Sequence, residues 1–153
     1  MIELKDLSKT YTVAGTVIRA VKPLDLAIQQ GEFVSIVGHS GSGKSTFLSL
    51  VGGIARPDTG SVRIDGTNIW EYGDRALSKL RNEKFGFVYQ FASLIPTLTA
   101  TENVLLPTVF GGAKSAADAV GLLQQVGLGD KLDRYSSELS GGEQQRVAIA
   151  RAF

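Results

Sequence analysis

Alternating hydrophobic and polar residues dominate the first part of the chain. Ile2 and Leu4 alternate with charged residues, residues 17–21 form a short β-branched run, and residues 24–28 alternate again before a turn at 29–31. A period of two residues is the pattern of a half-buried strand. These segments therefore predict an antiparallel β ribbon at the N-terminus.

Short apolar runs continue the pattern after this ribbon. Residues 32–37, Glu-Phe-Val-Ser-Ile-Val, predict a buried strand, and residues 46–51 are apolar at helical spacing. Glycine and proline between 52 and 60 interrupt the pattern. Residues 61–64 then predict another strand, and residues 85–89 predict a second buried strand.

Helix start and stop signals predict the first helices beyond the ribbon. Asp74 can cap a helix that runs through about Asn82. Thr99 and Glu102 have the spacing of a capping box, which begins a short helix that Pro107 stops.

Two further helices are predicted near the C-terminus. Ser115 begins a longer amphipathic helix that Gly127 closes. Ser140 and Glu143 again have capping-box spacing and predict the start of the last helix.

Composition and charge exclude several classes of protein. The 153 residues carry 16 Lys+Arg and 15 Asp+Glu, so the bulk charge gives no indication of a nucleic-acid partner. The absence of cysteine excludes disulfides and thiolate metal sites. No apolar stretch approaches the roughly 18 residues of a membrane span, and the N-terminus has no signal-peptide pattern. We expect one cytoplasmic domain over 1–153, with a core part over 1–90 and a helical part over about 91–153.

Residues 38–45 read Gly-His-Ser-Gly-Ser-Gly-Lys-Ser, a complete phosphate loop between a predicted strand and a predicted helix. The glycines allow backbone N–H groups to turn toward phosphate oxygens. Lys44 would bridge the β- and γ-phosphates, and the Ser45 hydroxyl would ligate Mg²⁺. His39 is interpreted as a solvent-facing spacer. A glycine-rich turn that holds nothing is the alternative, but the flanking elements favour a nucleotide site.

A second glycine pair lies in the first turn of the last predicted helix. Gly141 and Gly142 follow Ser140, and each costs about 1 kcal/mol relative to alanine. They leave the N–H groups at the positive end of the helix uncovered, which suits an incoming phosphate. A flexible hinge before an ordinary surface helix is the alternative.

The two motifs, GHSGSGKST at 38–46 and LSGGEQQRVAIARA at 139–152, resemble the phosphate loop and signature motif of the ATP-binding cassette (ABC) ATPase family. Residues 85–90 are similar to the strand and glutamine of the family's Q-loop. Residues 90–104 resemble the bacterial group that serves lipoprotein release and macrolide export. The resemblance covers the whole chain. It implies an α/β P-loop NTPase fold with an N-terminal antiparallel β ribbon, a central parallel sheet and a helical signature subdomain.

The resemblance also implies roles for individual residues. Tyr11 would stack on adenine; an exposed strand tyrosine is the alternative. Gln90 would reach the metal and the attacking water, unless it is only a polar residue at a strand end. Ser140, Gly141 and Gly142 would contact the γ-phosphate of ATP held by a second subunit in a head-to-tail dimer. ATP and Mg²⁺ would be held by the loop residues Gly38, Ser40, Gly41, Ser42, Gly43, Lys44, Ser45 and Thr46.

An apolar loop from Phe91 to Leu98 would dock a membrane permease, although it could instead fold back on the core. The chain is then the ATP-binding subunit of an ABC transporter, peripheral at the inner face of the membrane, where ATP binding and hydrolysis drive the permease. A soluble ABC ATPase and a non-catalytic nucleotide-binding module are the alternatives. The near-neutral charge and the apolar loop favour the transporter.

Several elements of the family have no counterpart in the pattern. No run of four apolar residues ends in the aspartate that would hold Mg²⁺, and the nearest, 62–65, is broken by Arg63. The catalytic glutamate and the switch histidine that would follow are also missing before Phe153. We therefore expect a fragment with an incomplete central sheet, whose strands 32–37 and 85–89 lie roughly 14 Å apart with unpaired edges. Such a fragment would neither fold stably nor hydrolyse ATP alone.

Overall fold

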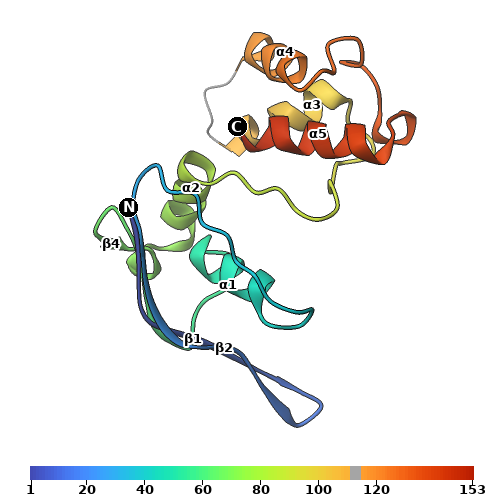
Figure 1. The fold of residues 1–153 in the computed structure, drawn as a ribbon. Coiled ribbons are helices and arrows are strands. Elements are labelled where there is room, and N and C mark those ends of the chain that lie inside the picture. The colour runs from blue at the N-terminus through green and yellow to red at the C-terminus, as the bar shows by residue number, and fades with distance from the viewer. Residues whose placement is uncertain (111–114) are drawn as a thin grey trace. The chain divides into compact units, whose positions relative to one another are not determined.

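The computed structural model describes residues 1–110 and 115–153. The chain divides into two compact units, Met1–Ser78 and Lys79–Phe153 (Figure 1). Within the described residues, no helix has the length and apolar character needed to cross a bilayer.

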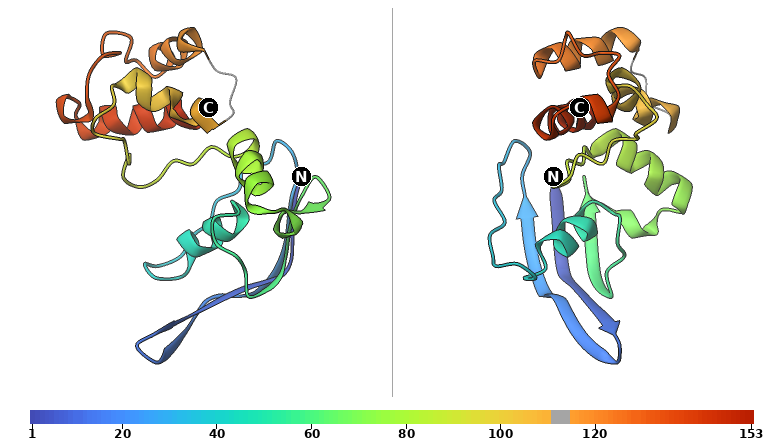
Figure 2. Two further views of the ribbon diagram at one scale, coloured as in Figure 1. Left: turned by 180° about the vertical axis from the view of Figure 1, so that it is seen from behind. Right: turned by 90° about the vertical axis from the view of Figure 1, so that its right-hand side faces the viewer.

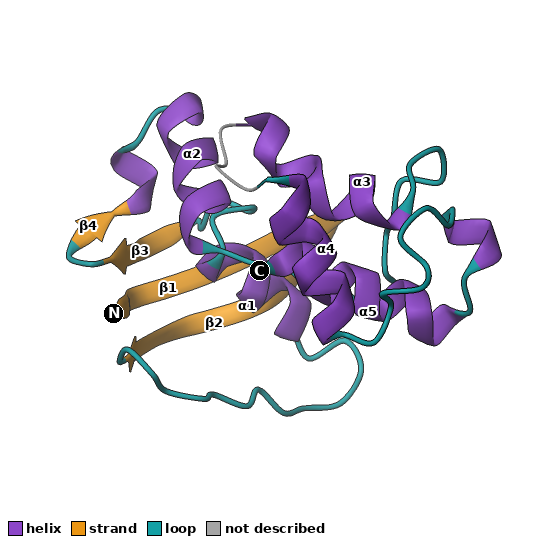
Figure 3. Cartoon of the chain, turned by 90° about the horizontal axis from the view of Figure 1, so that it is seen from above, coloured by secondary structure: helices purple, strands orange, loops and turns teal. Residues whose placement is uncertain are grey.

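The first unit, which is described throughout, is built on a four-stranded antiparallel sheet in the order β2-β1-β3-β4 (Figure 3). Strands β1, Ile2–Val13, and β2, Thr16–Ile28, form a long hairpin that extends beyond the other strands (Figure 2). Strand β3, Thr59–Ile64, pairs with the other edge of β1, and the short β4, Thr67–Asn68, pairs with β3. The predicted ribbon and the predicted strand at 61–64 are confirmed.

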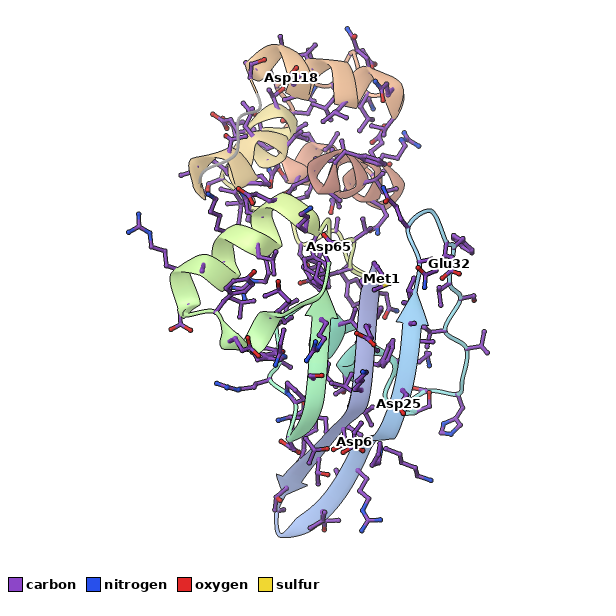
Figure 4. All side chains as sticks on the ribbon, turned by 90° about the vertical axis from the view of Figure 1, so that its left-hand side faces the viewer. Met1, Asp6, Asp25, Glu32, Asp65 and Asp118 are labelled. Atoms are coloured by element: carbon purple, nitrogen blue, oxygen red, sulfur yellow. The ribbon has the colours of Figure 1, made fainter. Side chains whose placement is uncertain are left out.

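Two polar contacts link neighbouring parts of this sheet, and Figure 4 labels the residues that make them. The terminal ammonium of Met1 pairs with the Asp65 carboxylate at 2.9 Å. The register of β1 and β2 shifts between Leu4 and Leu7, and Asp6 in this irregularity has a φ of 46°. The Asp6 N–H donates to the Asp25 carboxylate at 2.6 Å, so the irregular backbone keeps a hydrogen-bond acceptor.

Helix α1, Lys44–Val51, begins with the last two residues of the phosphate loop and confirms the helix predicted there. It buries Phe47, Leu50 and Val51 in the first unit. A short 3₁₀ turn, Ile69–Glu71, adds Ile69 to the buried set. Other fully buried apolar residues of this unit are Leu4, Leu7 and Val62.

The strands predicted at 32–37 and 85–89 are not formed, so both predictions were wrong. Phe33 and Val37 in the first segment are 96% and 86% exposed. A strand is stabilised by hydrogen bonds to a neighbouring strand, and no described residue pairs with either segment. In the second segment, the rings of Phe85, Phe87 and Tyr89 stack in sequence, with centroids 5.9 and 6.0 Å apart.

The described part of the second unit is helical. Its elements are α3, Ala100–Leu105, a 3₁₀ turn at Leu106–Phe110, α4, Ala116–Gln125, a 3₁₀ turn at Ser136–Glu138, and α5, Gly141–Ala152. Helix α2, Asp74–Lys84, begins in the first unit and ends in the second. The second unit has its own apolar core, made of Ala100, Val104, Ala119, Leu123, Leu128, Leu139, Val147 and Ala150.

Local capping signals set the helix starts. The capping boxes predicted at Thr99 and at Ser140 are both formed, and Ser115 begins α4 with a capping box of its own. One detail of the prediction was wrong, because Asp74 is the first residue of α2 rather than its cap. Helix α3 ends at Leu105, shortly before Pro107 as predicted, and the chain continues as a 3₁₀ turn.

Candidate functional site

The phosphate loop curls around the ammonium group of Lys44. Its Nζ donates hydrogen bonds to the carbonyl oxygens of Gly38 and His39, both at 2.8 Å. The Ser42 N–H donates to the same His39 carbonyl at 3.2 Å, which closes the loop. A ligand that binds the Lys44 ammonium would therefore also lie close to the backbone of this loop.

Gly43 connects the loop to helix α1. It caps the helix with a φ of 93°, a conformation that favours glycine. A Cβ on this residue would lie 2.0 Å from the carbonyl oxygen of Ala20 in β2. The loop can therefore approach β2 this closely only with glycine at position 43.

The start of α1 is suited to an anion. Gly43 provides no side-chain cap, and the first turn has no acidic residue. The N–H groups at the positive end of the helix therefore keep their capacity to bind an anion. Together with the Lys44 ammonium and the exposed Ser45 hydroxyl they form a donor set that fits a triphosphate. Serine oxygen is also a suitable ligand for Mg²⁺.

The remaining loop side chains are mostly accessible. Ser40 and Ser42 are exposed, and Thr46 is half-buried at the start of α1. His39 is exposed, as predicted, and its Nδ1 lies 2.7 Å from the Ser40 carbonyl oxygen.

Tyr11 lies on the β1–β2 hairpin with 40% of its surface exposed. It pairs with Ile18, two positions along β2 from Ala20, the residue that Gly43 approaches. The Lys9 ammonium lies 5.5 Å from the Tyr11 ring centroid. The exposed ring of Tyr11 in β1 thus lies across the hairpin from β2, the strand that the phosphate loop approaches.

Lys9 is fixed by an ion pair with Asp58 at 2.8 Å. The hydrogen bond from Lys9, followed by one from the Thr10 N–H, lowers the pKa of Asp58. The Asp58 carboxylate therefore stays charged and holds the ammonium beside the Tyr11 ring.

The signature turn, residues 140–143 at the start of α5, forms the capping box that its sequence predicts. The Ser140 hydroxyl accepts the Glu143 N–H at 3.3 Å, and the Glu143 carboxylate accepts the Ser140 N–H at 2.7 Å. Gly141 and Gly142 are exposed, and a Cβ on either would meet no atom within 4 Å. The positive end of α5 is therefore open to solvent.

Lys131 stabilises this turn, a role that the sequence did not predict. Its ammonium forms a short ion pair with the Glu143 carboxylate. The hydrogen bond from Lys131, together with those from Ser140, lowers the pKa of Glu143 to about 2. No spacing rule links these two residues, because Lys131 lies in the loop between α4 and α5.

Gln90 lies in an exposed bend rather than at the end of a strand. It lines a groove of about 490 Å³ in the second unit. The same groove is lined by Phe91, Ala92, Ser93, Leu94, Pro96, Ser136, Gly141, Gln144 and Gln145. The structure therefore brings Gln90 to the signature turn of its own chain, a proximity that the sequence did not indicate.

In the apolar loop from Phe91 to Leu98, some side chains are exposed and others pack back on the core. Phe91 and Ile95 are 77% and 41% exposed. Leu94, in contrast, packs against the core of the helical unit. Part of the loop folds back on this core, and part presents apolar side chains to solvent.

Asn103 of α3 fixes the second half of this loop. It is 1% exposed, its Oδ1 accepts the Ile95 N–H at 2.8 Å, and its Nδ2 donates to carbonyl oxygens of Ile95, Leu98 and Thr99. Sequence reasoning missed this residue as well. A polar residue among the apolar positions of a short helix was the available signal.

Comparison with known proteins gives a consistent picture. The family described as ABC transporter matches residues 21–153. The lipoprotein-releasing system ATP-binding protein LolD of Geobacter metallireducens is 46% identical over the whole chain and 69% of its own length. The macrolide export ATP-binding/permease protein MacB of Hyphomonas neptunium is 44% identical over the whole chain and 24% of its own length.

A solved structure is similar over the whole chain as well. It is the dimeric, post-hydrolysis ATP-binding cassette MJ0796 bound to ADP and Pi. The TM-score is 0.92 at 45% identity, and the match covers 100% of this chain and 69% of that one.

Proposed function

The chain belongs to the ABC transporter family of ATP-binding proteins, and on that basis we propose that it binds Mg-ATP at residues 38–46 to power a membrane permease. The family match and the 0.92 TM-score show the ATP-binding cassette fold. ATP hydrolysis is the reaction of full-length members of this family.

The observation that carries the proposal is the Lys44 ammonium enclosed by its own loop at the start of α1. On ATP binding, Lys44 would exchange two backbone carbonyls for oxygens of the β- and γ-phosphates. The backbone N–H groups of the loop and of the first turn of α1 would bind the remaining phosphate oxygens. The phosphate-contacting residues we propose are Gly38, Ser40, Gly41, Ser42, Gly43, Lys44, Ser45 and Thr46.

Mg²⁺ would be held by the hydroxyl of Ser45, together with phosphate oxygens and water. Gln90 is the second protein group proposed at the metal, through its amide oxygen. Bound Mg²⁺ would neutralise part of the phosphate charge. Tyr11 is proposed to stack its exposed ring on adenine, in agreement with its pairing to β2, the strand that the loop approaches.

We propose a head-to-tail dimer in which Ser140, Gly141 and Gly142 contact the γ-phosphate held by the other subunit. Their exposed backbone at the open end of α5 supports this role. The solved relative MJ0796 is described as dimeric, which agrees with the proposal. One subunit would thus complete the nucleotide site of its partner.

The permease contact is proposed at the exposed residues of the loop from Phe91 to Leu98. Phe91 and Ile95 gain a favourable environment only when another surface covers them. LolD is named as the ATP-binding protein of a lipoprotein-releasing system, and MacB is named as an ATP-binding/permease protein. We propose that this chain likewise lies at the inner face of the membrane through a permease.

Calorimetric titration with ATP tests the central proposal. Lys44→Ala removes a charge-assisted contact to the phosphates, so we expect affinity to fall at least about tenfold. Lys22→Ala is the matched control, because Lys22 is exposed on β2 outside the loop. Equal ATP binding by the Lys44 variant and the wild type would refute the proposal.

A further inference from the structure

Two side chains of helix α5 donate hydrogen bonds to the backbone before and after Gln90. Before it, Gln145 Nε2 donates to the Tyr89 carbonyl oxygen at 2.8 Å. After it, the Arg151 guanidinium donates to the carbonyl oxygens of Ala92 and Ser93, at 2.9 and 3.0 Å.

Gly86 makes a further close approach to the same helix. A Cβ on Gly86 would lie 2.1 Å from the carbonyl oxygen of Ala152, so no other residue fits there without a shift of backbone. The segment 86–93 thus starts beside Ala152 at the end of α5. It runs to Gln145 near Tyr89 and then returns to Arg151 at Ala92 and Ser93. Gln90 lies at the turn of this loop, and both arms are attached to one helix.

The helix that holds the loop also carries the signature turn. Gln90 and Gly141 line the same groove of about 490 Å³. The bonds from Gln145 and Arg151 therefore restrain the backbone on both sides of Gln90 relative to the helix that begins at Gly141.

We propose that Arg151 and Gln145 are positioning residues that hold Gln90 in register with the signature turn, so that both respond to nucleotide as one body. This inference rests on the proposed role of Gln90 at the nucleotide. It assigns a task to two residues that contact neither ATP nor metal in the proposed function.

The chemistry of each side chain suits this task. Arg151 donates through two separate nitrogens to two successive carbonyls, which fixes both the position and the direction of the backbone. Lysine could supply the charge but not this planar pair of donors. Gln145 contributes a neutral donor, and glutamate in its place would present an acceptor to the Tyr89 carbonyl.

Hydrogen–deuterium exchange of the full-length protein measures the attachment directly. In Arg151→Gln and Gln145→Glu we expect the segment 86–93 to exchange at least about tenfold faster, while α4 is unchanged. Arg75→Gln and Gln125→Glu make the same chemical changes at exposed positions on other helices and should have no effect. Unchanged exchange of 86–93 in both α5 variants would overturn the inference.

The kcat and KM of steady-state ATP hydrolysis show whether Arg151 positions Gln90 or only supports the fold. We expect Arg151→Gln to lower kcat at unchanged KM, and Arg151→Lys to recover part of the loss. If Arg151 acts through Gln90, the double variant with Gln90→Ala should lose no more activity than Gln90→Ala alone. Independent, multiplicative losses would refute the positioning role.

The same experiment distinguishes this inference from the proposed function. If Gln90→Ala leaves kcat unchanged, the proposed role of Gln90 fails and the inference fails with it. If Gln90→Ala lowers kcat but the losses multiply, only the inference about Arg151 fails.

Discussion

The conformation of single glycines decides how the phosphate loop meets the sheet, and Gly43 is the most constrained of them. Gly43→Ala would force an alanine to a φ of 93° and place its Cβ 2.0 Å from the Ala20 carbonyl oxygen. We expect a loss of about 2–4 kcal/mol in the free energy of unfolding. Urea denaturation followed by circular dichroism measures it.

Gly41→Ala is the matched comparison for this effect. Gly41 also has a positive φ, 78°, but a Cβ there would meet no atom within 4 Å. Its expected loss is only about 1 kcal/mol, from backbone strain alone. Similar losses in the Gly41 and Gly43 variants would show that the approach to Ala20 is not tight.

Glu143 makes the stability of the signature turn dependent on pH. Hydrogen bonds, the largest from Lys131, lower its pKa from 4.5 to about 2. A lowered pKa stabilises the folded state above the unfolded value, and this contribution is lost as pH falls from about 4.5 toward 2. The wild type should therefore be more stable than Glu143→Gln at neutral pH.

This advantage of the wild type should shrink below a pH of about 4.5. Urea unfolding of both proteins between pH of about 6 and about 2.5 gives the two curves. Lys131→Ala should raise the pKa of Glu143 and move the loss of stability to higher pH. A constant difference between wild type and Glu143→Gln over this range would contradict the assignment.

At the scale of single elements, helix α3 organises the loop before it through Asn103. Asn103→Ala would remove the partner of the Ile95 N–H and of the Leu98 carbonyl oxygen, and would leave the Ile95 and Thr99 carbonyl oxygens with one backbone donor each. We expect a loss of about 2–3 kcal/mol in the free energy of unfolding, measured by urea denaturation. Gln125→Ala, an exposed polar residue on α4, should change stability by less than about 0.5 kcal/mol. Equal effects would rule out this role of Asn103.

The helical elements were predictable because their signals are local. The capping boxes at Thr99 and Ser140 depend only on residues three positions apart, and the structure forms both. The segments 32–37 and 85–89 show the opposite case. Their apolar sequences indicate strands, but a strand needs a hydrogen-bonded neighbour, and none of the described residues provides one.

For the molecule as a whole, the sequence identified the residues that carry motifs and missed those that support them. The phosphate loop and the signature turn follow known spacings, so their residues could be named directly. Lys131 and Arg151 act on partners brought close only by the fold, Lys131 through an ion pair and Arg151 through backbone carbonyls. Backbone carbonyls are present at every residue, so no pattern of side chains points to them.

Exchange protection by ATP should reveal whether the signature turn serves a second subunit. With a non-hydrolysable ATP analogue, we expect residues 38–45 to be protected at any protein concentration, because one chain suffices to bind it. Protection of 140–142 should require association and therefore rise between about 1 and 100 µM protein. Hydrogen–deuterium exchange with mass spectrometry reports both segments in one experiment.

Gly142→Asp separates nucleotide binding from this dimer contact. A Cβ at Gly142 would meet no atom within 4 Å, and an acidic residue in the first turn of a helix is favourable, so the fold should persist. Its charge would repel the γ-phosphate of the partner's ATP. The variant should thus keep the protection of 38–45 and lose that of 140–142. Protection of 140–142 that is complete at the lowest protein concentration would contradict the head-to-tail arrangement.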